Sequence, residues 1–157
     1  MVLSENLKKS NILLKVKVKD RWELIEKMLS LAVKNKEIDK EYEEAIRKSL
    51  IERERAMSTG IGKGVAIPHC STAKVDNVII VLATSSEGVD FDSIDNLPVN
   101  IAILLIVPKN KLTQHIKTLA NIARIMGNDK LREDILKIGS SEKIIKTIKD
   151  YEKLTKK

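Results

Sequence analysis

Three short apolar runs, set between segments of helical periodicity, constrain the fold of this chain more than any other feature. The runs occupy residues 65–67, 78–83 and 101–107. They lack the polar alternation of a strand with one face in water, so we expect strands that are buried on both faces. The longest run has seven residues, whereas a membrane-spanning helix needs about 20. The sequence therefore predicts a sheet covered on both sides and no membrane insertion.

Segments with other periodicities surround these runs. Residues 12–18 alternate apolar side chains with lysine, which is typical of a half-buried strand. Asp20 and Asp39 are candidate N-caps for two helices, which we expect to end near Lys34 and Ala56. Apolar residues recur at helical spacing in three segments after the last run, residues 113–126, 129–137 and 141–154.

The order of these elements predicts the fold class. A strand and two helices precede the three apolar runs, and three helices follow them. No repeat, low-complexity segment or linker interrupts that order. We therefore expect one α/β domain over residues 1–157. Its mixed sheet should have about four to five strands, with parallel and antiparallel pairs, and helices should cover both of its faces.

The charge balance is open to two interpretations. The chain has 157 residues, with 29 Lys and Arg against 22 Asp and Glu, so its formal net charge is +7. Only six of the basic residues are Arg and only four residues are aromatic, whereas nucleic-acid surfaces usually use Arg forks and stacking rings. We favour a lysine-coated surface and no nucleic-acid binding. The alternative is a non-catalytic basic module that binds nucleic acid or acidic proteins through residues 141–157.

The cysteine content and the first residues indicate a compartment. Cys70 is the only cysteine, which excludes an intramolecular disulfide and fits a reducing environment. The first eight residues mix charged with apolar side chains and contain no signal-peptide core. We therefore expect a cytoplasmic protein.

Two histidines are the candidate reactive groups. His69 follows Pro68 at the end of a short predicted strand, and His115 lies where the helix after the last apolar run begins. A neutral imidazole is a competent nucleophile at neutral pH and can carry a covalent intermediate. Pro68 restricts the backbone directly before His69.

A glycine-rich loop precedes His69 and has two possible roles. Its backbone N–H groups could approach a phosphate, and the candidate phosphate-stabilising residues are Ser58, Thr59, Gly60, Gly62 and Gly64. Alternatively, the glycines only make the tight turn between a helix and a strand. The spacing matches neither of the common glycine-rich nucleotide motifs.

Metal binding and cysteine chemistry are less well supported. A zinc site would need His69, Cys70 and His115, but adjacent residues of an extended segment point to opposite faces and no fourth ligand is evident. We expect neither a metal nor a cofactor. Cys70 could act as a nucleophile served by His115, although a buried packing role is the simpler interpretation.

One segment resembles a known family. Residues 58–69, with the sequence STGIGKGVAIPH, closely resemble the phosphorylation-site segment of fructose/mannitol-type IIA domains, the EIIA type-2 domains of the bacterial phosphoenolpyruvate-dependent sugar phosphotransferase system. Three further segments resemble that family in the same order, namely Arg53-Glu54, residues 91–99 and residues 114–120. The resemblance therefore covers nearly the whole chain. Many members have glycine where this chain has Cys70.

The resemblance implies a phosphocarrier of α/β fold. His69 would accept and donate the phosphoryl group, Arg53 would steady it, and His115 would be the neighbouring imidazole. The implied donor is an HPr/NPr-like phosphocarrier, and the acceptor is a IIB domain or a regulatory target protein. Because no IIB-like segment is present, we expect a separate protein. The nitrogen-regulatory type is slightly favoured over a sugar-specific IIA.

Overall fold

A computed structural model describes residues 3–155. Short 3₁₀ turns join several of its elements, at Lys9–Asn11, Lys40–Tyr42 and Lys109–Lys111. The helices are α1 (Leu3–Asn6), α2 (Arg21–Lys34), α3 (Glu43–Ala56), α4 (Leu112–Met126), α5 (Asp129–Lys137) and α6 (Ser141–Thr155). The strands are β1 (Ile12–Leu13), β2 (Gly60–Gly62), β3 (Val65–Ala66), β4 (His69–Thr72), β5 (Ile79–Val89) and β6 (Val99–Pro108).

The strands form one mixed sheet, which confirms the predicted α/β class. Its order is β1-β5-β6-β3-β2, and β4 also pairs with β6. Strands β5 and β6 are antiparallel, as are β2 and β3, whereas β1 lies parallel to β5. The sheet has six strands instead of the predicted four to five, because β2 and β4 lie outside the apolar runs.

Strands β3 and β4 follow one another along the same edge of β6. Both run parallel to it, with Val65 opposite Ile101 and His69 opposite Leu105. Pro68 lies between them and has no N–H to donate, but its carbonyl accepts a hydrogen bond from the Leu105 N–H at 2.9 Å. The strand expected over residues 65–67 therefore ends before His69, and a second strand begins at His69 on the same edge of β6.

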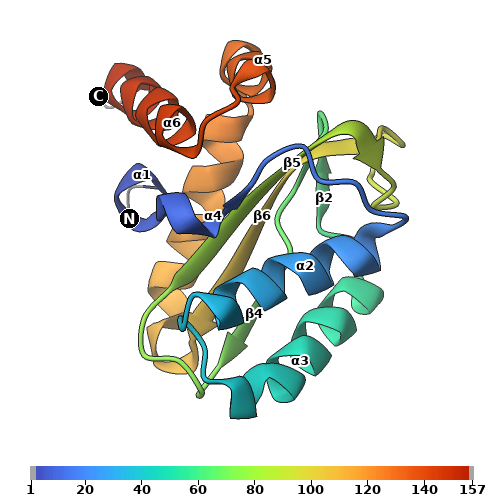
Figure 1. The fold of residues 1–157 in the computed structure, drawn as a ribbon, viewed down its shortest axis with the longest axis vertical. Helices are drawn as coiled ribbons and strands as arrows, with labels where there is room; N and C mark the ends of the chain where they lie inside the picture. Colours follow the sequence, from blue (N-terminus) through green and yellow to red (C-terminus); the bar gives the residue numbers. More distant parts are fainter. Residues whose placement is uncertain (1–2, 156–157) are drawn as a thin grey trace.

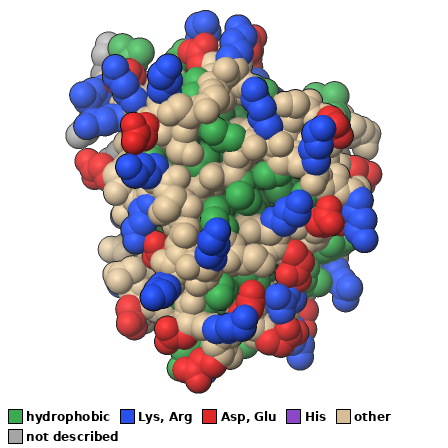
Figure 2. Space-filling view, in the orientation of Figure 1, with side chains coloured by type: hydrophobic (Ala, Val, Ile, Leu, Met, Phe, Trp, Pro, Cys, Tyr) green, Lys and Arg blue, Asp and Glu red, His purple; other side chains and the backbone are tan. Residues whose placement is uncertain are grey.

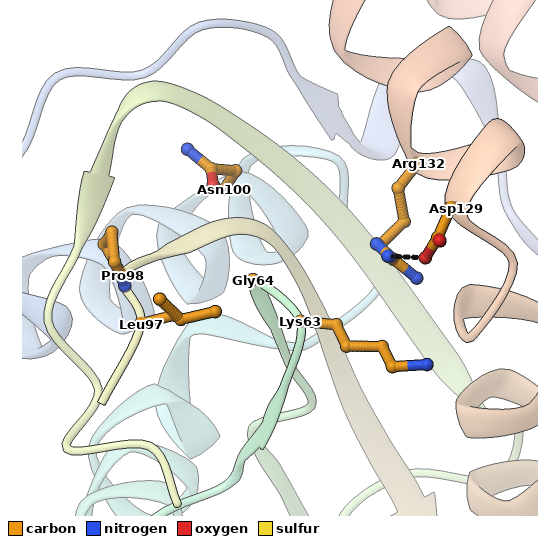
Figure 3. A pocket seen from close by; sticks show the side chains of 7 residues that line it. All are labelled: Lys63, Gly64, Leu97, Pro98, Asn100, Asp129 and Arg132. Carbon is orange, nitrogen blue, oxygen red and sulfur yellow. Dashed lines mark hydrogen bonds and ion pairs between the residues drawn. The ribbon is translucent and has the colours of Figure 1, made fainter. Parts of the chain in front are cut away.

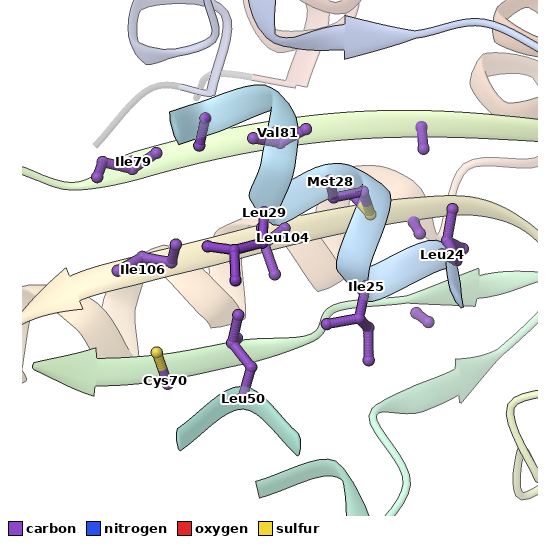
Figure 4. Close-up of a cluster of buried hydrophobic side chains, with 14 of the residues drawn as sticks. Leu24, Ile25, Met28, Leu29, Leu50, Cys70, Ile79, Val81, Leu104 and Ile106 are labelled. Atoms are coloured by element: carbon purple, nitrogen blue, oxygen red, sulfur yellow. The ribbon is translucent and has the colours of Figure 1, made fainter. Parts of the chain in front are cut away.

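Helices cover both faces of the sheet (Figure 1). Helices α2 and α3 pack on one face around Leu24, Met28 and Leu50, and Figure 4 shows part of this cluster. Helices α1, α4, α5 and α6 pack on the other face. In β5, Ile79 and Val81 face the first cluster, and Ile80 and Leu82 face the second. This two-sided burial explains why the run is apolar without alternation. No helix of residues 3–155 is both long and apolar enough to cross a membrane.

The two predicted helix starts have different outcomes. Asp20 is confirmed as an N-cap, since its carboxylate accepts a hydrogen bond from the Glu23 N–H at 2.9 Å. The prediction for Asp39 is wrong: its side chain makes no capping hydrogen bond, and a 3₁₀ turn separates it from α3, which begins at Glu43. The 3₁₀ turn occupies Lys40–Tyr42, so the α-helix begins three residues later than an N-cap at Asp39 would place it.

The strand predicted over residues 12–18 is much shorter than expected. Only Ile12 and Leu13 pair with the sheet. Lys15 has a φ of 53°, in the left-handed region, which ends an extended strand. Thr84 of β5 fixes the position of the chain after β1. Its hydroxyl accepts a hydrogen bond from the Lys15 N–H, and its carbonyl accepts one from the Val16 N–H. The apolar residues of this segment still pack inward although the segment has left the sheet, since Val16 contacts the first cluster.

Candidate active site

The fold brings the two histidines together. His69 begins β4, and His115 lies in the first turn of α4. Their ring centroids are 5.5 Å apart, and the ring planes are tilted by 56°. Strand β4 is parallel to β6 with Thr72 opposite Pro108, and α4 follows β6 after one 3₁₀ turn, so the first turn of α4 lies close to the short strand β4. Residues far apart in the sequence therefore share one site.

The His69 ring is held in a defined tautomer. Its Nδ1 lies 2.8 Å from the Ile67 carbonyl oxygen. A carbonyl can only accept, so Nδ1 carries the proton and Nε2 keeps its lone pair. Burial lowers the pKa of His69 below its ordinary value. The Ile67 hydrogen bond opposes that shift, while the positive charge of Arg53 adds to it. The ring is therefore neutral at physiological pH, with its lone pair on Nε2.

Arg53 stands beside both histidines. It belongs to the last turn of α3, and its Nη1 donates a hydrogen bond to the Met57 carbonyl at 2.7 Å. Arg53, His69 and His115 line one depression of about 420 Å³. The other residues lining it are Ser49, Glu52, Cys70 and Ser71. The guanidinium therefore lies at the same depression as the His69 ring.

His115 is more deeply buried than His69. Its side chain is 6% exposed, and its Nδ1 has no hydrogen-bond partner among the residues that the structure describes. Burial lowers the pKa of His115, and the neighbouring His69 lowers it further. Two neutral rings thus lie side by side, and protonation of one disfavours protonation of the other.

The glycine-rich loop forms a hairpin. Strands β2 and β3 pair with each other, and the turn between them places Gly62 and Gly64 at φ values of 94° and 80°, which glycine tolerates best. Those two glycines lie against Asp95 and Asn100. Neither of them lines a depression that contains His69. The tight-turn role fits these two positions.

The start of the loop lies closer to His69. Ser58 and Thr59 line a second depression beside His69, of about 310 Å³. Their hydrogen-bonding groups have partners within the protein. The Ser58 hydroxyl donates to the Phe91 carbonyl and accepts from the Gly60 N–H, and the Thr59 N–H and hydroxyl both donate to Glu54. The loop is thereby tied to α3 and to the segment before β6.

Glu54 has no predicted role of its own, but it is only 2% exposed in the structure. The sequence does contain a signal for that burial. Ile46, Leu50 and Glu54 are spaced four residues apart, and they are the buried residues of α3. Glu54 therefore occupies the apolar face of the helix, whereas the alternating charges of residues 52–55 suggest a solvated run.

Cys70 occupies a packing position. Its side chain belongs to the core cluster on which α2 and α3 pack (Figure 4). Burial alternates along β4, with Cys70 buried and His69 only half-buried. Burial raises the pKa of its thiol to about 12. A thiol with that pKa is not a nucleophile at neutral pH. Among residues 3–155, no group of three or more His, Cys, Asp and Glu side chains is arranged to hold a metal ion.

A larger depression does not include His69, Arg53 or His115 among its lining residues. Its volume is about 510 Å³, and Lys63 of the β2–β3 turn and the Asp129–Arg132 ion pair of α5 stand around it (Figure 3). Arg132 also donates to the Met126 carbonyl, and the Asn100 amide donates to the Ser85 carbonyl. The Arg132 and Asn100 side chains therefore have partners within the protein, and the described residues lining this depression include no histidine or cysteine.

Known proteins resemble the chain in both sequence and fold. It is 29% identical over 153 residues to the fructose-specific EIIABC component of Bacillus subtilis, which covers 98% of the chain and 24% of that protein. It is 36% identical over 96 residues to a nitrogen regulatory protein of Bradyrhizobium diazoefficiens, covering 61% of the chain and 63% of that protein. The chain thus spans about a quarter of the first protein and less than two thirds of the second.

The fold has a solved counterpart as well. The crystal structure of nitrogen regulatory protein IIA-Ntr from Neisseria meningitidis superposes with a TM-score of 0.85 at 28% identity, covering 94% of this chain and 99% of that one. The family model described as "Phosphoenolpyruvate-dependent sugar phosphotransferase system, EIIA 2" matches residues 5–151. This match confirms the resemblance of residues 58–69, and the chain belongs to the EIIA 2 family of the phosphoenolpyruvate-dependent sugar phosphotransferase system.

Proposed function

We propose that the protein is a phosphocarrier in which Nε2 of His69 accepts a phosphoryl group from the phosphohistidine of an HPr/NPr-like donor and passes it on. The observation that carries this proposal is the hydrogen bond from Nδ1 to the Ile67 carbonyl. In the His69 ring it leaves the lone pair on Nε2, and this ring lines the same depression as Arg53 and His115.

The transfer balances without a cofactor. The lone pair of Nε2 forms a bond to phosphorus while the donor's N–P bond breaks, and the donor imidazole keeps that electron pair. The Nδ1 proton stays on His69, and the Ile67 carbonyl keeps accepting the hydrogen bond from Nδ1–H. In such transfers, catalysis is mostly positioning and stabilisation of charge on the peripheral oxygens.

Arg53 and His115 supply that stabilisation in our proposal. Arg53 can present parallel N–H donors to two phosphoryl oxygens once it releases the Met57 carbonyl. His115 is a neutral ring within reach of a group on His69, since the centroids are 5.5 Å apart. A phosphoryl group brings up to about −2 of charge, and the positive charge of Arg53 lowers the free-energy cost of placing it on His69. Ser58, Thr59 and the glycines hold the segment in place and are secondary candidates for phosphate contacts.

Labelling from phosphoenolpyruvate tests this function. The protein is incubated with radiolabelled phosphoenolpyruvate and the general phosphocarriers of the system. We expect one acid-labile phosphoryl group per chain, complete loss of label in His69→Ala, and slower labelling in Arg53→Gln and His115→Ala. Omission of the general carriers is the control and should abolish labelling. Wild-type labelling of His69→Ala would overturn the assignment.

Two uses of the phosphoryl group are possible within the family. A sugar-specific protein would hand it to a IIB domain, and a nitrogen-regulatory protein would bind its targets according to phosphorylation state. The fold likeness to IIA-Ntr, at 28% identity over nearly all of both chains, slightly favours the regulatory output. Chase of the phosphorylated protein with a IIB domain separates them: loss of label from His69 to IIB indicates sugar transfer, and retained label indicates regulation.

A further inference from the structure

A buried carboxylate lies behind the proposed nucleophile. The Glu54 side chain is 1% exposed. One oxygen, Oε2, accepts from the Thr59 N–H at 3.0 Å, and the other, Oε1, accepts from the Thr59 hydroxyl. Arg21 supplies the compensating positive charge, with its Nη1 3.5 Å from Oε2. Burial of a carboxylate is costly without such partners, so the position is built around this contact.

A continuous path of hydrogen bonds leads from Glu54 to the His69 ring. Glu54 holds both donors of Thr59. The Thr59 carbonyl accepts from the Ile67 N–H at 3.0 Å, and the Ile67 carbonyl lies 2.8 Å from His69 Nδ1. The path joins the end of α3, the start of the loop and the start of β4. Because each link fixes the position of the next, a shift of Thr59 moves the carbonyl that holds the ring.

A second contact fixes the same loop from the other side. The Phe91 carbonyl accepts from the Arg21 guanidinium at 2.7 Å and from the Ser58 hydroxyl. Arg21 therefore links the Glu54 carboxylate to the segment that holds Ser58. The loop is held at two successive residues, Ser58 and Thr59, and both connections include Arg21.

We propose that Glu54 is a positioning residue for His69, which holds Thr59 so that the Ile67 carbonyl keeps the ring in its Nδ1–H tautomer with Nε2 free. The inference rests on the proposed function, because a fixed tautomer matters only if Nε2 is the nucleophile. Glu54 acts through Thr59 and Ile67 and need not touch the phosphoryl group. Its negative charge also favours the ordered arrangement of three donors, which a neutral side chain of the same size cannot reproduce.

The substitution Glu54→Gln isolates this role. Glutamine keeps the volume, but its amide nitrogen is a donor and would face a Thr59 or Arg21 donor. We expect a mixture of His69 tautomers, resolved by ¹⁵N NMR of the ring, where the wild type shows only Nδ1–H. We also expect the turnover rate for phosphoryl acceptance to fall roughly ten- to a hundredfold, by analogy with hydrogen-bonding partners that orient metal-ligating histidines, with the KM for the donor unchanged. Glu44→Gln makes the same change on the exposed side of α3 and should leave both readouts at the wild-type level.

Thr59 provides a milder series if Glu54→Gln does not fold. Thr59→Val removes the hydroxyl and keeps the N–H, so it should shift the tautomer ratio and rate in the same direction by a smaller factor. Thr59→Ser keeps both donors and should lie closer to wild type. A single Nδ1–H tautomer in a folded Glu54→Gln or in Thr59→Val would overturn the proposal. Absence of labelling in the wild type would instead overturn the proposed function, because the tautomer is measured without phosphoryl transfer.

Discussion

At the scale of single residues, burial controls the reactivity of His69. The ordinary pKa of histidine is 6.5, and burial and the charge of Arg53 lower the pKa of His69 in the folded protein. We expect the ring to titrate below 6.5 by NMR, and the labelling rate to stay level as the pH falls through 6.5. Arg53→Gln removes a nearby cation and should raise the pKa of His69 towards its ordinary value.

The same shift makes stability depend on pH. In the unfolded chain His69 takes up a proton near pH 6.5, whereas the folded ring resists it. The unfolded state thus binds more protons between the two pKa values, so the contribution of His69 to stability falls as the pH drops below about 6.5. Denaturant titrations of wild type and His69→Ala measure this difference. A measured pKa for His69 at or above 6.5 would contradict the assignment of burial as the dominant cause.

Single residues also show what the sequence could predict of the site. The resemblance pointed to His69, Arg53 and His115, and the structure places all three around one depression. Glu54 could be found only from its place on the apolar face of α3, a signal that its charged neighbours obscure. The hydrogen bond to the Ile67 carbonyl could not be predicted at all, because it depends on how β4 follows β3 beside β6.

At the scale of elements, the β2–β3 hairpin depends on a close approach at Gly60. A Cβ there would lie 2.1 Å from the Ser93 hydroxyl oxygen and 3.0 Å from Ser93 Cβ. Ser93 is buried, so it has little room to move. We expect Gly60→Ala to lower the free energy of unfolding by about 1–3 kcal/mol, the usual cost of overpacking, as measured by denaturant titration.

Two further variants make this prediction specific to the contact. Gly139→Ala serves as the control, because nothing lies within 4 Å of a Cβ at that position, and it should leave stability nearly unchanged. Ser93→Gly removes the two nearest of the three atoms that the new Cβ would meet and leaves only Phe91 Cβ at 3.2 Å, so Gly60→Ala should cost less in that background. Equal costs in the two backgrounds would show that the contact with Ser93 does not limit the hairpin.

The elements were predicted best where burial repeats regularly along the chain. Strands β5 and β6 carry long apolar runs, and the helices carry apolar stripes, so both kinds of element were anticipated. Strand β2 contains two glycines, and β4 has the mixed sequence of His69–Thr72, so neither has a periodic pattern. They are strands because β3 and β6 offer them hydrogen-bonding partners. Pairing across the sheet is not visible in local sequence.

At the scale of the whole molecule, the face shown in Figure 2 carries dispersed positive charge. Figure 2 shows Lys and Arg side chains distributed over one face, with Asp and Glu among them. Several basic groups are also engaged locally, since Arg47 contacts Glu26, Glu43 and Glu44. A distributed charge of this kind steers a partner over long range and gives no specific contact. Membership of the EIIA 2 family, together with the mixed charges on this face, favours the phosphocarrier interpretation over a basic module that binds nucleic acid.

The net charge of +7 should therefore affect how fast the donor arrives and leave the chemistry unchanged. Raising the salt concentration from about 20 to about 300 mM shortens the range of charge interactions, so we expect the KM for the phosphorylated donor to rise, by roughly tenfold, at constant kcat. Replacing Lys143, Lys146 and Lys149 of α6 by Gln reduces the net charge from +7 to +4, because 7 − 3 = 4. This variant should raise KM at low salt only. A KM that does not respond to salt, or a kcat that falls with it, would show that specific contacts and not the overall field bring the donor to His69.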